Sequence, residues 1–247
     1  MKIDPSPTSN SFTLSTIGVV HSCYKEKFGI PKQPGLVDSA TARLELLPPY
    51  NRMDTLDGLS EFSHIWIHFI FHACIKEGWK AKVRPPRLGG NKKLGVFATR
   101  ATHRPNPLGL SVVRIGRIYQ EDKSVFIDLH GADLLDGTPV VDIKPYLPYA
   151  DNITDAKGGF APEPTQTKPV RFSELAERQC KAHQNLHNKD ITILIKQIIE
   201  QDPRPSYLSR QTDREHGIAL WDLNIKWCAR IDHFEILSIE PVHGSRT

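Results

Sequence analysis

The chain has 247 residues, and its 32 lysines and arginines nearly balance its 28 aspartates and glutamates, so the formal net charge is only +4. This argues against a generally basic protein, and the length suits one large domain or one domain with a smaller companion. The four cysteines lie far apart with no CxxC pair, which argues against a structural zinc site or a disulfide scaffold and favours a reducing cytoplasm.

The N-terminal sequence and the hydropathy pattern argue against export or membrane insertion. The first residues, MKIDPSPTSNS, contain no apolar core of the kind a signal peptide needs. No apolar run approaches the roughly 20 residues of a membrane-spanning helix. We therefore expect a soluble, cytoplasmic protein without a membrane partner.

Two short strands and a loop are predicted near the start of the chain. Residues 12–20 favour a first strand, and residues 42–47 alternate in polarity before ending at Pro48 and Pro49, as a strand does. Between them, residues 25–35 are rich in glycine, proline and lysine. Loops of this kind carry function more often than strands do.

Residues 62–74, FSHIWIHFIFHAC, predict a buried strand because aromatic and β-branched side chains dominate them. His64, His68 and His72 would share one face, since their spacing of four suits a strand and is close to a helical turn. Three aligned histidines suggest metal ligands, but no fourth ligand accompanies them, and imidazoles on an apolar strand are usually satisfied by hydrogen bonds. We therefore expect no metal.

The span of residues 78–120 contains no aspartate or glutamate. Its cations are Lys80, Lys82, Arg84, Arg87, Lys92, Lys93, Arg100, Arg104, Arg114 and Arg117. A solvated basic face is the simplest explanation of such a run. Because no acid within the span offsets the charge, however, the run projects a positive field, and we favour an anionic partner.

Within this span lies a predicted rigid bend between two strands, over residues 96–99 and 110–115. The bend, HRPNPLG, contains two prolines, which fix φ and remove backbone donors, so a sheet cannot absorb it. Arg100 and Arg104 are held there as planar cations suited to a carboxylate or a phosphate. A stiff loop that carries two guanidinium groups is more than a simple connection between strands requires, so we expect it to have a binding role.

An acidic stretch follows the basic span. Strands are predicted over residues 125–129 and 140–146, with Asp136 and the glycine after it forming a tight-turn signal between them. Turn chemistry explains Asp136. Asp133 and Asp142 flank apolar runs, and turn formation accounts for them less well.

A linker and two helices are predicted next. Residues 155–169 are rich in glycine, proline and threonine, as interdomain linkers are. Ser173 can cap a helix whose first turn is acidic, and Asp190 can cap a second helix over residues 191–201.

Two strands complete the chain. Residues 221–227 alternate between apolar and polar side chains, which is typical of a half-buried strand, and residues 234–239 can pair with it. The fold class is therefore mainly β over roughly the first 150 residues, followed by a small α+β domain.

The chain lacks the sequence signatures of several enzyme classes. The chain has no GxGxxG after a strand, no phosphate-binding GxxxxGK[ST], no GxSxG and no HExxH. A Rossmann-type nucleotide or methyl-donor site is therefore disfavoured. From residues alone we expect a β domain that binds an anionic ligand, with nucleic acid favoured.

Four long motifs go further: GVFATR-x-x-x-RPNP-x-G, RPPRLGGN, DGTPVVDIKPYLPYAD and QDPRP-x-Y. Their order and sequence closely resemble the TrmO family of tRNA methyltransferases, from about Ile17 to Pro241. The resemblance implies an S-adenosylmethionine-dependent enzyme built on a β-barrel, with a barrel domain at 11–154, a linker at 155–170 and a C-terminal α+β domain at 171–247. It also implies a homodimer with the donor site near the subunit interface.

The implied substrate is the adenosine just 3′ of the anticodon in tRNA, already carrying a threonylcarbamoyl group and methylated on its exocyclic nitrogen. By matching motifs, the resemblance assigns the donor pocket to Pro34, Gly35, Leu36, His72, Ala73, Arg100, Leu110, His130, Gly131, Ala132 and Asp133. Asp133 would pair with the donor's ammonium or ribose hydroxyl, and Arg100 with its carboxylate. The family pattern leads us to expect a smaller residue at His130, which limits its contact to backbone.

The resemblance and the residues together suggest contacts with the anticodon arm at Arg104, Lys144, Tyr146, Asp202, Arg204 and Tyr207. Tyr207 can stack on an exposed loop base, although a capped turn after a helix explains the last three equally well. A carboxylate such as Asp136 or Asp142 could take the proton of the acceptor nitrogen, but the sequence assigns no base.

Two other hypotheses stay open at this point. A non-catalytic RNA-binding module would keep the barrel and the basic face without binding the donor. A third possibility keeps the donor and changes the acceptor to a small metabolite or another RNA.

Overall fold

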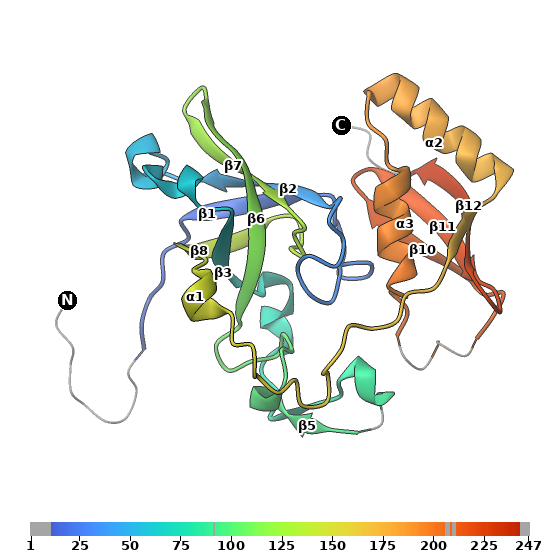
Figure 1. The fold of residues 1–247 in the computed structure, drawn as a ribbon, viewed down its shortest axis with the longest axis horizontal. Helices are drawn as coiled ribbons and strands as arrows, with labels where there is room; N and C mark the ends of the chain where they lie inside the picture. Colours follow the sequence, from blue (N-terminus) through green and yellow to red (C-terminus); the bar gives the residue numbers. More distant parts are fainter. Residues whose placement is uncertain (1–10, 91, 206–207, 209–210, 243–247) are drawn as a thin grey trace.

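The computed structural model describes residues 11–90, 92–205, 208 and 211–242. The first part of the chain forms a closed antiparallel barrel with the strand order β1-β2-β7-β6-β3-β8 (Figure 1). The strands are β1 (Gly18–Ser22), β2 (Thr41–Leu46), β3 (His64–Ile70), β6 (Leu108–Glu121), β7 (Ser124–His130) and β8 (Thr138–Pro145). These elements confirm the mainly β fold class and the barrel.

Alternation along each strand builds the barrel core. On β3, Ile65, Ile67 and Phe69 point inward and are buried, whereas His64 and His68 point outward and are half-buried. Because side chains of a strand alternate between its two faces, the apolar set fills the interior and the histidines are excluded from it.

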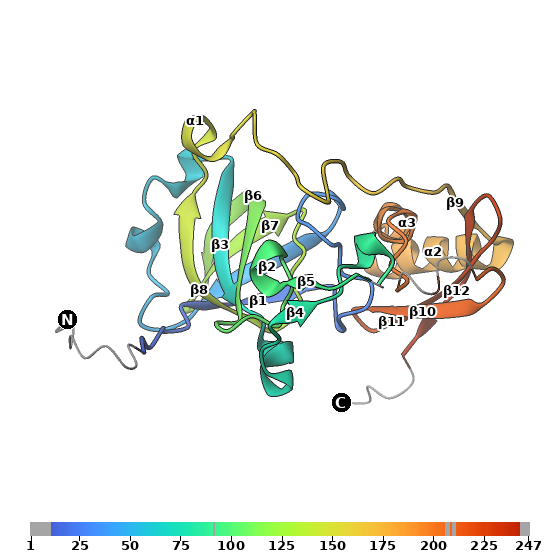
Figure 2. The same ribbon diagram turned by 90° about the horizontal axis from the view of Figure 1, so that it is seen from below.

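Short helices and a small hairpin decorate the barrel. They are η1 (Met53–Leu56), η2 (Leu59–Glu61), η3 (His72–Glu77), β4 (Lys82–Val83), η4 (Pro86–Leu88), β5 (Leu94–Gly95), η5 (Val96–Ala98) and α1 (Pro148–Asp151). The hairpin β4–β5 extends from the barrel in Figure 2 and carries much of the basic span.

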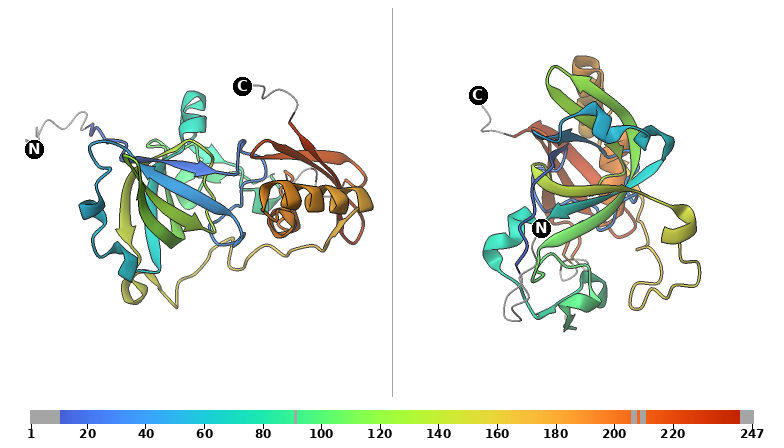
Figure 3. Two further views of the ribbon diagram at one scale, coloured as in Figure 1. Left: turned by 90° about the horizontal axis from the view of Figure 1, so that it is seen from above. Right: turned by 90° about the vertical axis from the view of Figure 1, so that its left-hand side faces the viewer.

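The C-terminal part is a four-stranded sheet with the order β10-β11-β12-β9, covered on one face by two helices (Figure 3). Its elements are β9 (Val170–Phe172), α2 (Glu174–His187), α3 (Thr192–Glu200), β10 (Glu215–Leu220), β11 (Leu223–Ala229) and β12 (Phe234–Pro241). The predicted cap is confirmed, because Ser173 Oγ accepts the Ala176 N–H at 3.1 Å. Asp190 accepts the Thr192 N–H at 2.8 Å, just before α3.

Four predicted strands differ from the structure. The first strand begins at Gly18 rather than residue 12. Residues 96–99 are not a strand: Val96–Ala98 form a helical turn, which the Thr99 hydroxyl closes by donating to the Val96 carbonyl at 2.8 Å. Side-chain hydrogen bonds of this kind compete with a sheet ladder.

The other two differences concern strand limits. The aromatic strand ends at Ile70, so His72 lies on η3 rather than beside His64 and His68. Residues 221–227 are interrupted by a turn: Trp221 has a left-handed φ of 51° and joins β10 to β11. Alternation alone did not reveal that turn, because no glycine marks it.

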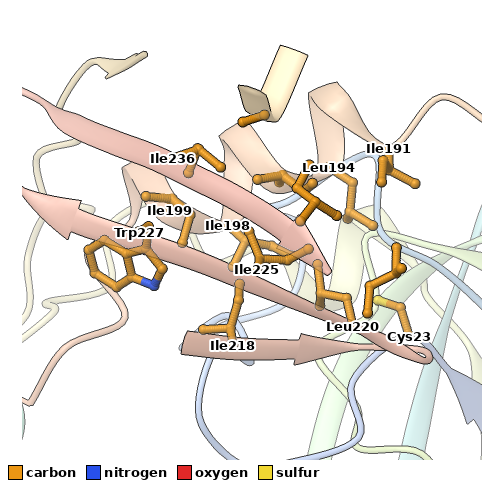
Figure 4. Close-up of a cluster of buried hydrophobic side chains, with 14 of the residues drawn as sticks. Cys23, Ile191, Leu194, Ile198, Ile199, Ile218, Leu220, Ile225, Trp227 and Ile236 are labelled. Carbon is orange, nitrogen blue, oxygen red and sulfur yellow. The ribbon is translucent and has the colours of Figure 1, made fainter. Parts of the chain in front are cut away.

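The loop between β1 and β2 belongs to both parts of the molecule. Cys23, Tyr24, Val37 and Ala40 are buried in the C-terminal core with residues of α3, β10 and β11, and Figure 4 shows Cys23 beside Leu220. We call residues 23–40 the shared loop. Between α1 and β9, residues 152–169 form no helix or strand. No helix of the described chain has the length and apolar character needed to cross a bilayer.

Candidate active site

A cleft of about 710 Å³ lies where β3 ends and β6 begins. Residues 30–33 of the shared loop form one wall, and the start of η3 forms another. The bend at residues 99–104 closes a third side, while Ser111 and Asp133 lie at its floor. The volume is in the range of small-molecule sites.

Asp133 is the acidic group of the floor. Ser111, which points inward from β6 and is 2 % exposed, donates its hydroxyl to Asp133 Oδ1 at 2.7 Å. Burial raises the pKa of Asp133 to about 6, although the Ser111 hydrogen bond and the charge of Arg100 lower it. No ion pair of Asp133 is found among the described residues. A partly desolvated carboxylate without a fixed cation suits a cationic or hydroxyl-bearing ligand.

Arg100 is held across the cleft from that floor. Its Nη2 donates to the Leu110 carbonyl at 3.0 Å, and its Nη1 donates to the Gln33 side chain. The guanidinium thus ties the bend to β6 and to the shared loop. The bend that carries Arg100 and the turn that carries Asp133 therefore line one cleft within a single chain.

Arg104 shapes the bend from within. Its Nη1 donates to the carbonyls of Thr99 at 2.8 Å and Val96 at 3.3 Å, and its guanidinium carbon lies 5.8 Å from the centre of the Phe97 ring. The side chain also lines the cleft. It therefore both supports η5 and presents positive charge to the site.

A glutamate joins three walls of the cleft. Glu77, at the end of η3, accepts from Lys27 of the shared loop at 3.0 Å and contacts His103 Nε2 of the bend at 2.8 Å. These two partners lower the pKa of Glu77 to about 2. Cys74, Glu77 and His103 have potential ligand atoms within 4.8 Å of one another. Two lysine ammonium groups lie near this carboxylate, Lys27 at 3.0 Å and Lys80 at 3.7 Å, and both oppose the binding of a cation. The cluster is therefore best described as an ion-pair network.

Five of the predicted donor residues line the cleft: His72, Ala73, Arg100, Leu110 and Asp133. Five others, Pro34, Gly35, Leu36, Gly131 and Ala132, lie beside it, and the Gly35 N–H donates to the Gly131 carbonyl at 2.9 Å. A Cβ at Gly131, where φ is 68°, would come within 3.3 Å of Gly35. Only glycine allows the two segments to approach this closely.

His130, the last predicted donor residue, faces elsewhere. A Cβ on Gly116 would lie 2.8 Å from His130 Nε2, so the ring covers β6 from the outside of the barrel. Its side chain lines a second hollow together with Lys25 and Asp136. The structure brings only its backbone near the cleft, through the peptide it shares with Gly131.

Neither suggested base lies in the cleft. Asp136 accepts the Ser22 N–H at 2.9 Å and pairs with Lys25 at 2.6 Å, in the second hollow. Asp142 is half-exposed on β8 and pairs with Lys144 at 3.2 Å. The carboxylates that line the cleft are instead Asp133 and Glu77.

The predicted RNA contacts are scattered. Tyr146 donates its N–H to the His64 carbonyl at the far end of β3, about 20 Å from the cleft by strand rise, and Lys144 lies on the same end of β8. Arg204 is 5 % exposed and binds both carboxylate oxygens of Asp202, at 2.7 and 2.9 Å. Tyr207 lies outside the described residues.

The cleft residues that were not predicted include Lys32, Gln33, Glu77 and Ser111. Ser111 could have been found, since it is the polar residue at an inward position in the otherwise apolar first half of β6. The other three lie on irregular segments whose direction the sequence pattern does not encode.

The chain is similar to known proteins in sequence and in fold. The profile described as the tRNA-methyltransferase O N-terminal domain matches residues 19–152, and the TrmO C-terminal domain profile matches residues 165–242. A protein of Escherichia coli K12 named tRNA (adenine(37)-N6)-methyltransferase is 44 % identical over 234 residues, covering 94 % of this chain and 99 % of the relative.

Two further similarities concern Pseudomonas aeruginosa. A protein of strain PAO1, named there as a candidate S-adenosylmethionine-dependent methyltransferase, is 48 % identical over 220 residues, covering 87 % of this chain and 91 % of the relative. The crystal structure of TrmO from Pseudomonas aeruginosa superimposes with a TM-score of 0.78 at 41 % identity, covering 94 % of this chain and 99 % of that one.

Proposed function

The chain belongs to the tRNA-methyltransferase O family, and we propose that it transfers a methyl group from S-adenosylmethionine to the exocyclic nitrogen of adenosine 37 in tRNA. The observation that carries this proposal is the meeting of Arg100, Ser111 and Asp133 in one cleft of the barrel. Because tRNA is the acceptor, we place the activity in the cytoplasm.

The residues of the cleft fit the donor. Its carboxylate would meet Arg100, and its ammonium or ribose hydroxyl would meet Asp133, which forms no ion pair among the described residues. The close contact of Gly35 with Gly131 leaves backbone rather than side chains beside the cleft. The bound donor would supply an electrophilic methyl group on a sulfonium.

The protein itself then contributes by aligning the acceptor with the methyl group of the donor. Direct displacement requires nucleophile, carbon and sulfur in line, and the walls tied by Arg100 and Glu77 hold the site for that geometry. Glu77 is a weak base because its pKa is near 2. The acceptor nitrogen lies between a purine and a carbonyl, which makes its proton unusually acidic and reduces the demand for a base.

We further propose that the acceptor already carries a threonylcarbamoyl group, as the family resemblance implies. The anticodon arm would lie along the basic span beside the cleft. Acids from outside that span pair with Lys80, Arg114 and Arg117. No ion pair within the described chain neutralises Lys82, Arg84 or Lys93, so the hairpin β4–β5 keeps its positive field for RNA phosphates.

Transfer of labelled methyl groups tests both levels of the proposal. We expect the protein to label tRNA that carries threonylcarbamoyl adenosine and to leave the unmodified tRNA unlabelled. Equal labelling of both RNAs would remove the specificity claim and keep the methyltransferase. Absence of labelling, together with salt-dependent tRNA binding and no donor binding, would favour the non-catalytic RNA-binding module.

Arg100→Ala tests the donor pocket. We expect about a tenfold to hundredfold weaker donor affinity by calorimetry, because a charge-assisted fork is lost. Arg52→Ala is the matched control, since Arg52 pairs with Asp54 on η1 and does not line the cleft. Unchanged affinity in Arg100→Ala would reject the assigned role.

We also propose a homodimer with the donor site near its interface. Leu108 and Leu110 line the cleft while 39 % and 40 % exposed, and Phe97 beside Arg104 is 76 % exposed. Exposed apolar groups gathered at one rim are typical of an interface. Sedimentation equilibrium tests this, and a monomer at micromolar concentration would refute it.

A further inference from the structure

The cleft contains four lysine and arginine side chains, and three of them are already engaged. Lys27 pairs with Glu77. Arg100 donates to Gln33 and the Leu110 carbonyl, and Arg104 donates to backbone carbonyls of the bend. The fourth, Lys32, has no hydrogen bond or ion pair from its ammonium group within the described residues.

The surroundings of Lys32 leave its charge unneutralised. Burial lowers the pKa of Lys32, Asp202 opposes this shift, and Arg87 adds to it. Asp202 cannot supply a strong partner, because Arg204 occupies both of its carboxylate oxygens. Lys32 is a solvent-exposed residue of the cleft wall, and the acid that opposes its charge is engaged by Arg204, so its ammonium is open to an incoming anion.

The position of Lys32 is fixed rather than loose. The neighbouring Phe28 and Ile30 pack against the C-terminal core, and Gln33 on its other side is bound by Arg100. The backbone that carries Lys32 is therefore held in the cleft wall formed by the shared loop, and Lys32 lines the same cleft as Asp133 and Ser111.

A carboxylate is the anion that this site suits best. A single ammonium is a point charge, whereas RNA backbones are usually followed by rows of cations, which here lie on the hairpin β4–β5. The donor's own carboxylate already has a partner in Arg100 under the proposed function. The threonylcarbamoyl group of the acceptor brings a second carboxylate into the same cleft.

We propose that Lys32 is a specificity-determining residue that pairs with the carboxylate of the threonylcarbamoyl group on the acceptor adenosine. This inference rests on the proposed function and deepens it. It explains how a methyltransferase could distinguish a modified adenosine from an unmodified one, because only the modified base places an anion opposite this ammonium.

The test uses two acceptors and four forms of the full-length protein. One tRNA carries the free threonyl carboxylate, and the other carries the same group converted to its neutral methylamide. The proteins are the wild type, Lys32→Ala, Lys32→Arg and the control Lys123→Ala, whose exposed lysine lies in the β6–β7 turn away from the cleft. Initial rates give kcat/KM, and calorimetry gives donor affinity.

We expect the wild type and Lys123→Ala to prefer the free acid over the amide by about tenfold to hundredfold, as for a charge-assisted contact. Lys32→Ala should lose this preference through a lower rate on the acid alone, and Lys32→Arg should keep most of it. Donor affinity and the thermal midpoint of Lys32→Ala should be unchanged.

Three results would overturn the inference. An equal loss on both acceptors would mean that Lys32 binds an RNA phosphate. A loss of donor affinity would mean that it serves the donor. A preserved acid preference in Lys32→Ala would place the carboxylate elsewhere. Failure of the proposed function is distinguishable, because the wild type would then methylate neither acceptor.

Discussion

At the scale of single residues, the two carboxylates that line the cleft have opposite pKa shifts. Asp133 sits at the floor, where burial raises its pKa to about 6, and Glu77 sits at the wall, where Lys27 and His103 lower its pKa to about 2. The two carboxylates differ because Asp133 is buried without an ion pair among the described residues, whereas Glu77 is paired with Lys27 and hydrogen-bonded to His103. Asp133 can accept a cationic group of a ligand, whereas Glu77 holds the cleft walls together.

Asp133 makes donor binding dependent on pH. The ionised form binds the donor, and it is present above the folded-state pKa, so affinity should rise as pH increases to about 6 and then level off. Below pH 6 the affinity should fall by about tenfold per pH unit. Calorimetric titrations from about one pH unit below that pKa to about two units above it measure this.

Two variants make the pH prediction specific. Asp133→Asn should abolish the dependence. Ser111→Ala should move its midpoint upward, because the Ser111 hydrogen bond favours the ionised carboxylate. A midpoint that stays in place would assign the titration to another group. Between the ordinary aspartate pKa and pH 6, the unliganded protein should lose stability as pH rises, since the folded state binds the extra proton.

At the scale of elements, strand β6 connects the barrel core to the cleft. Its first residues, Leu108 to Ser111, line the site, and Gly109 pairs with Phe69 of β3. A Cβ on Gly109 would overlap the Phe69 ring. Phe69 is 6 % exposed and packs against Phe71 at 5.1 Å between ring centres, so it has little room to move.

Gly109→Ala should therefore destabilise the fold by about 1–3 kcal/mol, the usual cost of overpacking a core. The matched control is Gly95→Ala, because that glycine has an ordinary φ of −57° and no atom within 4 Å of a new Cβ. Denaturant unfolding compares the free energies of unfolding of the two variants, provided that the dependence on denaturant concentration has the same slope in both. Equal stability of both variants would show that Phe69 can rotate away.

The end of η3 is the element that joins the cleft walls. Glu77→Gln removes the charge that Lys27 and His103 share, so the shared loop and the bend should exchange amide hydrogens faster. Donor affinity should weaken only a few-fold, since half-exposed ion pairs contribute little. Glu61→Gln on η2 is the control, and an unchanged exchange rate at the bend in Glu77→Gln would argue against the network.

At the scale of the whole molecule, the shared loop makes the two parts interdependent. Gly35 and Gln33 serve the cleft, while Tyr24, Val37 and Ala40 are buried in the C-terminal core. The Trp221 N–H donates to the Cys23 carbonyl at 2.8 Å, and Ser39 donates both its N–H and its hydroxyl to Gln197. Packing in the second part therefore fixes a wall of the site in the first.

Ile195→Ala tests this interdependence. Ile195 lies on α3, is fully buried, and does not line the cleft, so truncation should cost about 2–5 kcal/mol of stability. Amide exchange in residues 23–40 should accelerate and donor affinity should fall, although no donor contact is removed. Leu186→Ala on α2, 78 % exposed, should change neither. Unaltered exchange in the shared loop of Ile195→Ala would separate the two parts.

Local patterns determined much of this architecture. Alternation located β2, because a half-buried strand must repeat every two residues, and the strands predicted at residues 125–129, 140–146 and 234–239 correspond to β7, β8 and β12. The capping serine located α2, since its hydroxyl satisfies an orphan backbone donor. The domain limits at 154 and 170 remain predictions, and the shared loop shows why a boundary in sequence is not one in space.

The sequence predicted only part of the site. The motifs led to Arg100 and Asp133, which the fold brings into one cleft. They also led to Asp136, His130 and Tyr146, whose side chains face other surfaces. A motif records which residues occur in order, and the direction of each side chain depends on strand register and loop path.

The sequence by itself determined the fold class, the family and the chemistry that the chain can carry, because hydrophobic period, turn residues and long motifs are local properties. Only the tertiary structure decided that Lys32 forms no ion pair or hydrogen bond with its ammonium among the described residues, that Glu77 joins three walls, and that the C-terminal core holds the shared loop. Each of these depends on contacts between segments distant in the chain. Such contacts follow from the closure of the barrel and from burial of the loop, which no local pattern encodes.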